Sequence, residues 1–276
     1  MQDEMLSRRK LLAGGAAVLG LAAMPFLAAR PAAAAAGDPG DVSTNPFPYE
    51  QLNPDAMGRR AYEVYYASYC AEANWWPIIE ALAASSNPTV AAPWQTIPKN
   101  IFKYAAGGVD GWGTVCGCLN GACATIAATG APATLGDALV QWYTEAALPT
   151  NFIDRAVRTG WTPTGAPVPL VNVPTSIAQS PLCHNSLSQW TMVSKGLPSS
   201  VATVGDRCGK LSADVCRKMV ELLNAYHKDN AHFVPTTVLS ASTRACKASG
   251  CHTGAFAQGK QDCDPCHTMA ADHMSE

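Results

Sequence analysis

Two short clusters of cysteine and histidine near the end of the sequence have the spacing of c-type haem attachment sites. Residues 263–267 are Cys-Asp-Pro-Cys-His, the common form, and residues 246–252 carry the rarer form with four residues between the cysteines. Both thiols of such a site bond to haem vinyl groups, and the adjacent histidine binds the iron. The sequence therefore predicts two c-type haems, attached to Cys246, Cys251, Cys263 and Cys266, with His252 and His267 as proximal ligands. A zinc site or a chance cluster is the alternative.

Each haem iron also needs a sixth ligand, unless it keeps an open position for a substrate. His227 and His232 are the favoured distal candidates, because they fall at the end of the longest expected helix and just beyond it. His184 and His273 are the other candidates, and His184 could instead serve a metal site at its neighbour Cys183. Histidine on both sides of the iron predicts low-potential haems without a substrate position. This favours an electron carrier over an enzyme.

Two other functions stay open at this point. The first is a multihaem oxidoreductase in which one haem keeps an open site and reduces a small oxyanion or peroxide. The second is a structural role, in which the haem segment docks into a larger cytochrome assembly. No hydrolytic triad, phosphate loop or nucleotide-binding motif is present in the sequence.

The beginning of the chain has the pattern of an export signal. Ser7 is followed by two arginines, an apolar stretch at 11–27 and an alanine-rich end at 32–36. This order predicts a twin-arginine signal peptide over residues 1–36 and a periplasmic location, with an uncleaved anchor as the alternative. No later stretch approaches the ~18 apolar residues of a membrane-spanning helix, so no stable span is expected after cleavage.

Seven of the eleven cysteines lie outside the haem motifs, and they admit two interpretations. In an exported protein cysteines usually form disulfides, although an odd number leaves one unpaired. Alternatively, four thiolates could hold an iron–sulfur cluster. The twin-arginine route carries folded proteins, whereas c-type haem is attached outside the membrane. A second cofactor inserted in the cytoplasm would explain folded export, and this tips the balance toward a cluster.

Composition and periodicity predict a mainly α-helical protein. Only 14% of residues are charged and the net charge is −2, so the chain lacks the basic surface that nucleic acid would require. Apolar residues recur at helical spacing, and the remaining stretches are rich in proline, glycine or serine. Helices are predicted over 54–85, 115–128, 135–147 and 213–230, the last with Asp206 as an earlier start. Loops are predicted over 88–98 and 150–180, the latter with a short strand pair.

These elements divide the chain into four parts. Residues 37–53 are a predicted linker, residues 54–235 a helical domain with the cysteine site, and residues 236–276 an irregular dihaem-binding segment. This last segment has too few large apolar residues for a core of its own. Two exposed porphyrins would form a large apolar patch, so a homodimer that buries them is expected.

The helical domain contains several short motifs around its cysteines. They are Tyr69-Cys70-Ala71, Gly111-Trp112-Gly113, the run from Cys116 to Ala122, Ser180-Pro181-Leu182-Cys183-His184 and Arg207-Cys208-Gly209. These motifs resemble a family of redox-active proteins named for four cysteines. With the two haem sites added, the chain more narrowly resembles the split-Soret cytochromes c within that family, and the resemblance covers roughly residues 55 to 276.

The resemblance implies a helical, homodimeric, periplasmic dihaem protein with bis-histidine irons, closely stacked haems and redox proteins as partners. It also implies an iron–sulfur site, whose ligands carry over to Cys70, Cys116, Cys183 and Cys208. Three further cysteines are alternates for this site. They are Cys118, which replaces a small residue of the family motif, Cys123 and Cys216.

Overall fold

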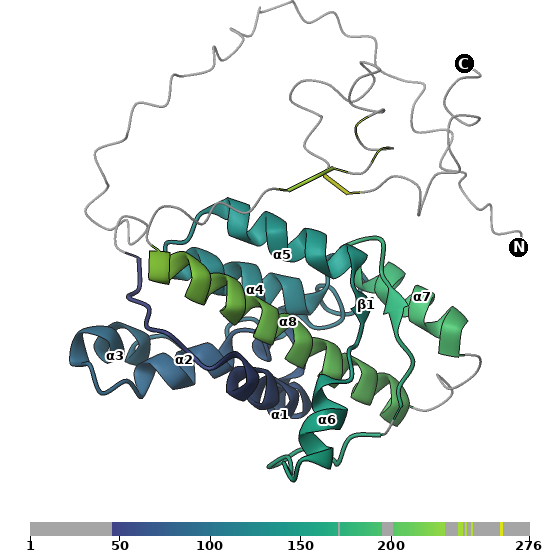
Figure 1. Ribbon diagram of the computed structural model, residues 1–276, viewed down its shortest axis with the longest axis horizontal. Coiled ribbons are helices and arrows are strands. Elements are labelled where there is room, and N and C mark those ends of the chain that lie inside the picture. Colours follow the sequence, from purple (N-terminus) through teal and green to yellow (C-terminus); the bar gives the residue numbers. More distant parts are fainter. Residues whose placement is uncertain are drawn as a thin grey trace, which may run out of the picture. The chain divides into compact units, whose positions relative to one another are not determined.

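The protein is described by a computed structural model that covers residues 46–170, 172–194, 201–229, 237–239, 241, 244 and 260–261. Its architecture is mainly α-helical, which confirms the predicted fold class (Figure 1). The elements in chain order are α1 (Pro54–Glu72), α2 (Trp76–Ala83), α3 (Pro88–Gln95), the 3₁₀ helix η3 (Lys103–Ala105), α4 (Gly117–Ala128), α5 (Ala133–Glu145), β1 (Ala147–Leu148), α6 (Phe152–Arg158), β2 (Ser176–Ile177), α7 (Cys183–Ser194) and α8 (Val201–Asp229).

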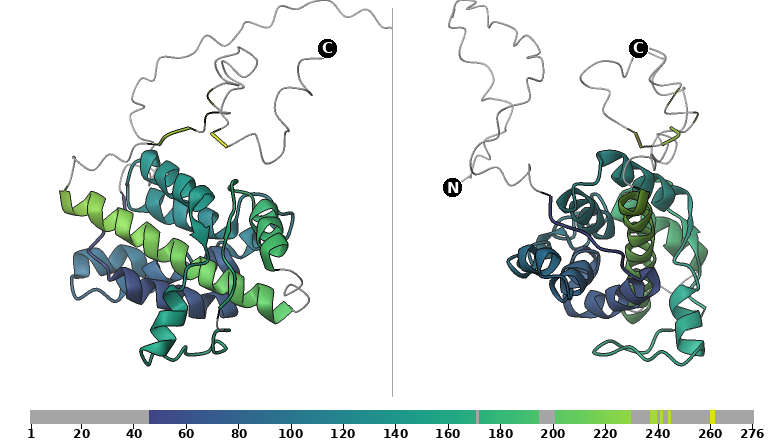
Figure 2. Two further views of the ribbon diagram at one scale, coloured as in Figure 1. Left: turned by 45° about the vertical axis from the view of Figure 1, so that its right-hand side comes forward. Right: turned by 60° about the vertical axis from the view of Figure 1, so that its left-hand side comes forward.

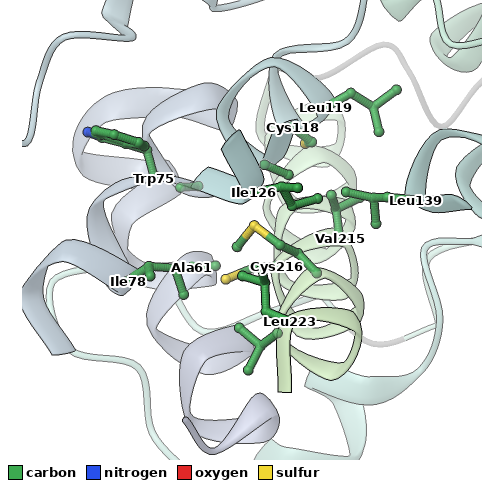
Figure 3. Packing of buried hydrophobic residues seen from close by; sticks show 14 of the residues in the cluster. Ala61, Trp75, Ile78, Cys118, Leu119, Ile126, Leu139, Val215, Cys216 and Leu223 are labelled. Carbon is green, nitrogen blue, oxygen red and sulfur yellow. The ribbon is translucent and has the colours of Figure 1, made fainter. Parts of the chain in front are cut away.

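The long helix α8 is the centre of the helical body. It packs along α1, and it also contacts α4, α5 and α6 (Figures 1 and 2). Helical spacing predicts a buried stripe along it, made of Leu211, Val215, Met219, Leu222 and Tyr226. The first four are buried, and Tyr226 is half-buried against the core. Figure 3 shows this core, where Cys216 of α8 faces Ala61 of α1. Among the described residues, no helix combines the length and apolarity that crossing a membrane would need.

The single helix predicted over 54–85 is wrong in its continuity, because α1 is kinked near its end and a turn separates it from α2. Asn53 caps α1 by accepting a hydrogen bond from the backbone N–H of Ala56 at 3.0 Å, and Pro54 fits the first helical position. At Tyr69 the backbone has φ of 68° and ψ of −175°, outside the helical region. Helical spacing of apolar residues continues across this bend, so periodicity alone did not reveal it.

The predicted loop at 88–98 is also wrong, because α3 occupies most of it. Asn87 accepts a hydrogen bond from the N–H of Thr89 at 3.1 Å, and a proline again starts the helix. Trp94 is fully buried, and its indole N–H donates to the carbonyl oxygen of Pro48 at 2.7 Å. Burial of this ring stabilises a short helix that its prolines would otherwise disfavour.

The region between 147 and 194 is more ordered than its composition indicates. A short strand pair is present, with β1 and β2 antiparallel and Ala147 opposite Ile177. Only β2 lies in the stretch at 150–180 where the pair was predicted, because β1 directly follows α5. The helix α6 lies between these strands in the sequence, within the stretch predicted as loop, and α7 follows them. Two buried residues of α6, Phe152 and Ile153, form a second small cluster with Tyr62 of α1. A helix this short is not stable alone, and this apolar contact stabilises α6.

Part of the predicted linker lies against the helical body. The backbone N–H of Phe47 donates to the carbonyl of Ala128 at 2.8 Å, and the Tyr49 hydroxyl donates to Oδ1 of Asn224 at 2.8 Å. Phe47, Tyr49 and Leu52 also pack against the main hydrophobic core. Residues 47–52 therefore contact both the end of α4 and the last turns of α8.

Candidate redox site

Five cysteines from four different helices come together inside the helical body. The thiol of Cys118 interacts with those of Cys70 and Cys116, and the thiol of Cys116 also interacts with that of Cys183. Cys208 of α8 completes the group, because its sulfur interacts electrostatically with Cys70 and Cys116. The four cysteines that the family resemblance selected therefore lie at one place, together with Cys118. We call these five cysteines the sulfur cluster.

Two backbone features bring Cys116 and Cys183 together. The backbone N–H of Cys116 donates to the carbonyl of Pro181 at 2.9 Å, and that of Cys183 donates to the carbonyl of Thr114 at 2.7 Å. These bonds form an isolated antiparallel bridge in which Val115 faces Leu182. The bridge places both cysteines at the start of a helix: Cys116 directly precedes α4, and Cys183 is the first residue of α7.

Cys70 reaches the site because glycine stands opposite it. A Cβ atom on Gly117 would lie well inside van der Waals contact with the Cys70 sulfur, and 2.5 Å from the carbonyl oxygen of Ala105. Only glycine therefore allows α1 and α4 to approach this closely. The unusual backbone of Tyr69 directly precedes Cys70 and turns the last part of α1. Strained backbone of this kind is often found at functional sites.

All seven cysteines outside the predicted haem motifs are free thiols, but two of them lie away from this site. Cys123 faces the start of α5, near Asp137 and 3.6 Å from a Cβ that would be placed on Gly136. Cys216 is fully buried in the core, near Tyr49, and burial raises its pKa. Cys118 and Cys216 are well separated in Figure 3. The structure therefore does not bring Cys123 or Cys216 to the sulfur cluster.

A buried arginine balances the charge of this cluster. Arg207 is 2% exposed, and its Nη1 lies 3.7 Å from the sulfur of Cys208. Burial by itself would lower the pKa of Arg207, but its attraction to Cys208 and neighbouring ionisable groups outweighs burial, and the net shift is upward. For Cys208 the effect of burial has the opposite sign: burial raises the pKa of this thiol, and the positive charge of Arg207 partly offsets the rise. A positive charge held this deep needs negative partners.

The sulfur cluster also contains hydrogen-bond donors without acceptors. The Nε–H of Arg207 and the hydroxyl of Tyr143 are both buried, and neither meets an acceptor in good geometry among the described residues. The Tyr143 hydroxyl has the Cys116 thiol within reach, but not in good geometry. Buried donors are nearly always well paired in native proteins, so an unpaired Nε–H and a poorly paired hydroxyl beside a group of thiols point to an acceptor that belongs there.

This donor set has the chemistry that an iron–sulfur cluster requires. Within the described residues, no group of three or more His, Cys, Asp or Glu is arranged to hold one metal ion. Thiolate sulfurs are the usual ligands of such clusters, and the inorganic sulfides would accept hydrogen bonds from unpaired donors.

The two histidine candidates that the structure describes differ in their surroundings. His184, the second residue of α7, is exposed, and its backbone N–H donates to the carbonyl of Gly113 at 3.1 Å. His227 lies near the end of α8, and its Nε2 is buried without a hydrogen-bond partner in the described part of the chain. The signal peptide and the sites predicted at His232, Cys246, Cys251, His252, Cys263, Cys266, His267 and His273 lie outside the described residues.

Sequence reasoning missed Arg207, Tyr143 and Ser212 as members of the site. The Ser212 hydroxyl lies 3.3 Å from the sulfur of Cys118. For Arg207 a signal was available, because this charged residue directly precedes the proposed ligand Cys208 in a helix that must be buried. Nothing in the sequence places Tyr143 near a cysteine, because it reaches the site only when α5 packs on α4.

The fold and the site define a mainly helical protein that gathers thiols and a compensating arginine in its interior. No family model matches the chain. The chain is 28% identical over 285 residues to the split-Soret cytochrome c of Desulfovibrio desulfuricans, and the alignment covers 96% of both proteins. A solved structure of the split-Soret cytochrome c from the same organism, described as having a novel iron centre, superposes with a TM-score of 0.67. It has 28% sequence identity and covers 82% of this chain and 91% of the other. The predicted resemblance to split-Soret cytochrome c is confirmed.

Proposed function

We propose that this protein is a periplasmic dihaem c-type cytochrome that transfers electrons and carries an additional iron–sulfur centre. The observation that carries the proposal is the meeting of Cys70, Cys116, Cys183 and Cys208 at one buried place. These residues are spread over more than half of the helical domain, and each comes from a different helix or helix start. The related protein's novel iron centre supports iron at this site.

The residues of the helical body would bind and shield this centre. The four cysteine sulfurs supply the thiolate ligands, and helices α1, α4, α7 and α8 exclude water from most of the site, because Cys70 and Cys116 are at most 8% exposed. A bound iron–sulfur cluster accepts and releases single electrons. Its potential depends on burial and on hydrogen bonds to its sulfur atoms, so the surrounding donors belong to the function.

The haem part of the proposal rests on the two attachment motifs and on the related protein's being a cytochrome c. Cys246, Cys251, Cys263 and Cys266 would attach the haems, with His252 and His267 as proximal ligands. Export by the twin-arginine route and assembly as a homodimer complete the proposal, with redox proteins as partners. Electrons would then move between haems, cluster and partner.

Iron and acid-labile sulfide should be measured in protein purified without air. We expect more than two irons per chain, labile sulfide, and an intact mass with two haem additions that survive acid–acetone extraction. Serine variants of Cys70, Cys116, Cys183 and Cys208 should each lose the sulfide and keep the haems. Protein that lacks sulfide from the start, or that carries one haem, would contradict the corresponding part of the proposal.

The three remaining cysteines provide matched controls. Cys123→Ser and Cys216→Ser remove thiols outside the cluster and should keep a wild-type sulfide content. Cys118→Ser should also keep the sulfide, because the family motif has a small residue at this position. Loss of sulfide in Cys118→Ser together with its retention in one of the four ligand variants would show that Cys118 is a ligand instead.

A further inference from the structure

Arg207 has more hydrogen-bonding capacity than its visible partners use. Its Nη2 donates to the backbone oxygen and to the hydroxyl of Ser186 at 3.1 and 2.7 Å, which ties α8 to α7. Its Nη1 lies 3.7 Å from the Cys208 sulfur, and its Nε–H has no acceptor among the described residues. The contacts with Ser186 explain a structural role, but they leave the rest of the guanidinium facing the sulfur site without sufficient acceptors.

The hydroxyl of Tyr143 is a second buried donor beside the same cluster. The residue is fully buried, so its hydroxyl has lost water, yet it meets no acceptor in good geometry within the described segments. It lies within reach of the Cys116 thiol without good hydrogen-bond geometry, and it also interacts electrostatically with Arg207. A buried hydroxyl that makes no good hydrogen bond costs up to roughly 1–3 kcal/mol. Phenylalanine would fill the same space without that cost, so the hydroxyl needs an explanation other than packing.

We propose that Arg207 and Tyr143 donate hydrogen bonds to sulfur atoms of the iron–sulfur centre and thereby hold its reduction potential high. This inference rests on the proposed function, because it assumes that the centre is present. When the centre gains one electron, with no proton taken up, its negative charge increases. A buried positive charge and buried hydrogen-bond donors stabilise that extra charge more than they stabilise the oxidised form.

The test is an anaerobic redox titration in which paramagnetic resonance follows the reduced centre separately from the haems. Arg207→Gln removes the charge, Arg207→Lys keeps a charge but changes the donor geometry, and Tyr143→Phe removes only the hydroxyl. At a fixed solution potential we expect Arg207→Gln to lower the ratio of reduced to oxidised centre about tenfold, equivalent to ~59 mV for one electron. Tyr143→Phe and Arg207→Lys should lower the same ratio by about threefold.

Two control variants separate this effect from a general loss of charge or hydroxyl. Arg217→Gln removes a positive charge from the same helix, nine residues after Cys208 and thus about 14 Å along the axis. Tyr226→Phe removes a hydroxyl about 27 Å along the axis from Cys208. Both control proteins should keep the wild-type potential of the centre.

The outcomes distinguish the two levels of the argument. Wild-type protein without labile sulfide defeats the proposed function, whatever the variants do. Sulfide-containing Tyr143→Phe and Arg207→Lys proteins that both titrate like wild type overturn the present inference alone. If Arg207→Gln fails to fold, Arg207→Lys and Tyr143→Phe still test the proposed effect on the reduction potential. Arg207→Lys keeps the positive charge, and Tyr143→Phe leaves every hydrogen bond to Ser186 intact.

Discussion

The imidazole ring of His227 stacks on the phenol ring of Tyr49, with ring centroids 4.7 Å apart and 25° between the planes. Asn224, one turn earlier on α8, accepts the Tyr49 hydroxyl at 2.8 Å and so holds the phenol in place. Burial lowers the pKa of His227, which favours the neutral imidazole. A neutral, oriented imidazole with an unpaired Nε2 is the state in which histidine binds a metal. This arrangement favours His227 as a distal haem ligand.

His227→Ala should therefore convert one haem from low spin to high spin. We expect a high-spin band in the optical spectrum of the oxidised protein and binding of carbon monoxide to the reduced form, for half of the haem. His184→Ala is the matched control and should remain low-spin, because the His184 ring is exposed. If the His227→Ala protein stays fully low-spin, the assignment is wrong and another histidine is the distal ligand.

Gly121 and Gly136 should respond in opposite ways to alanine. A Cβ on Gly121 of α4 would lie well inside van der Waals contact with the backbone oxygen of Ala71 in α1, and backbone cannot move aside cheaply. A Cβ on Gly136 of α5 would meet only the Cys123 sulfur at 3.6 Å, an ordinary contact. Urea denaturation should show Gly121→Ala destabilised by about 1–3 kcal/mol or more. Gly136→Ala should be stabilised by about 0.5–1 kcal/mol. Equal effects would show that helix propensity, not the approach of α1 to α4, controls both sites.

Lys210 should be far more important for stability than another lysine on the same helix. Its ammonium is buried and forms ion pairs with Asp154 at 2.7 Å and Asp206 at 2.9 Å. Lys210→Met leaves two buried carboxylates without a positive charge, although Asp206 keeps the hydrogen bond from the Tyr62 hydroxyl, and should lower the free energy of unfolding by about 3–5 kcal/mol. Lys218→Met, which removes a partly exposed pair with Glu221, should change it by at most about 1 kcal/mol. A small change in Lys210→Met, measured by urea denaturation at pH 7, contradicts this prediction.

Asp214 should make the protein less stable as the pH rises from about 4 to about 6. Burial raises the pKa of this carboxyl from 3.8 to about 6, although hydrogen bonds from Thr150 partly oppose the shift. The folded state then binds a proton more tightly than the unfolded state, so the contribution of Asp214 to stability is full below about pH 4 and is lost as the pH passes 6. The loss amounts to about 3 kcal/mol.

Asp214→Asn should abolish this part of the pH dependence. An asparagine amide can accept the Thr150 N–H and donate to the Thr150 hydroxyl, so both contacts survive. The difference in unfolding free energy between variant and wild type should therefore grow in favour of the variant from pH 4 to pH 6 and then stay constant. Taking the difference cancels other groups, among them Glu72, whose pKa burial raises to about 7. A difference that does not vary with pH rules out Asp214 as the source.

The sequence by itself determined the helical class, the haem motifs and the buried stripe of α8. These features depend on residues that are neighbours in the chain or that recur at a helical period, so local spacing carries the information. The same reasoning failed where local signals and tertiary contacts conflict. Prolines at 88 and 93 indicated a loop, but burial of Trp94 makes this segment a helix. The helical pattern across residues 54–85 concealed the bend at Tyr69.

The membership of the sulfur cluster was decided only by the tertiary structure. Spacing in the sequence cannot separate Cys118, which joins the cluster, from Cys123, which faces α5 only five residues later on the same helix. Cys208 and Cys216 are similarly related on α8, where one meets the other sulfurs and the other fills the core. Tyr143 and Arg207 enter the site because α5 and α8 pack beside α4. Which side of a helix meets which neighbour is set by packing across the whole body, and this long-range contact is not encoded in the local pattern.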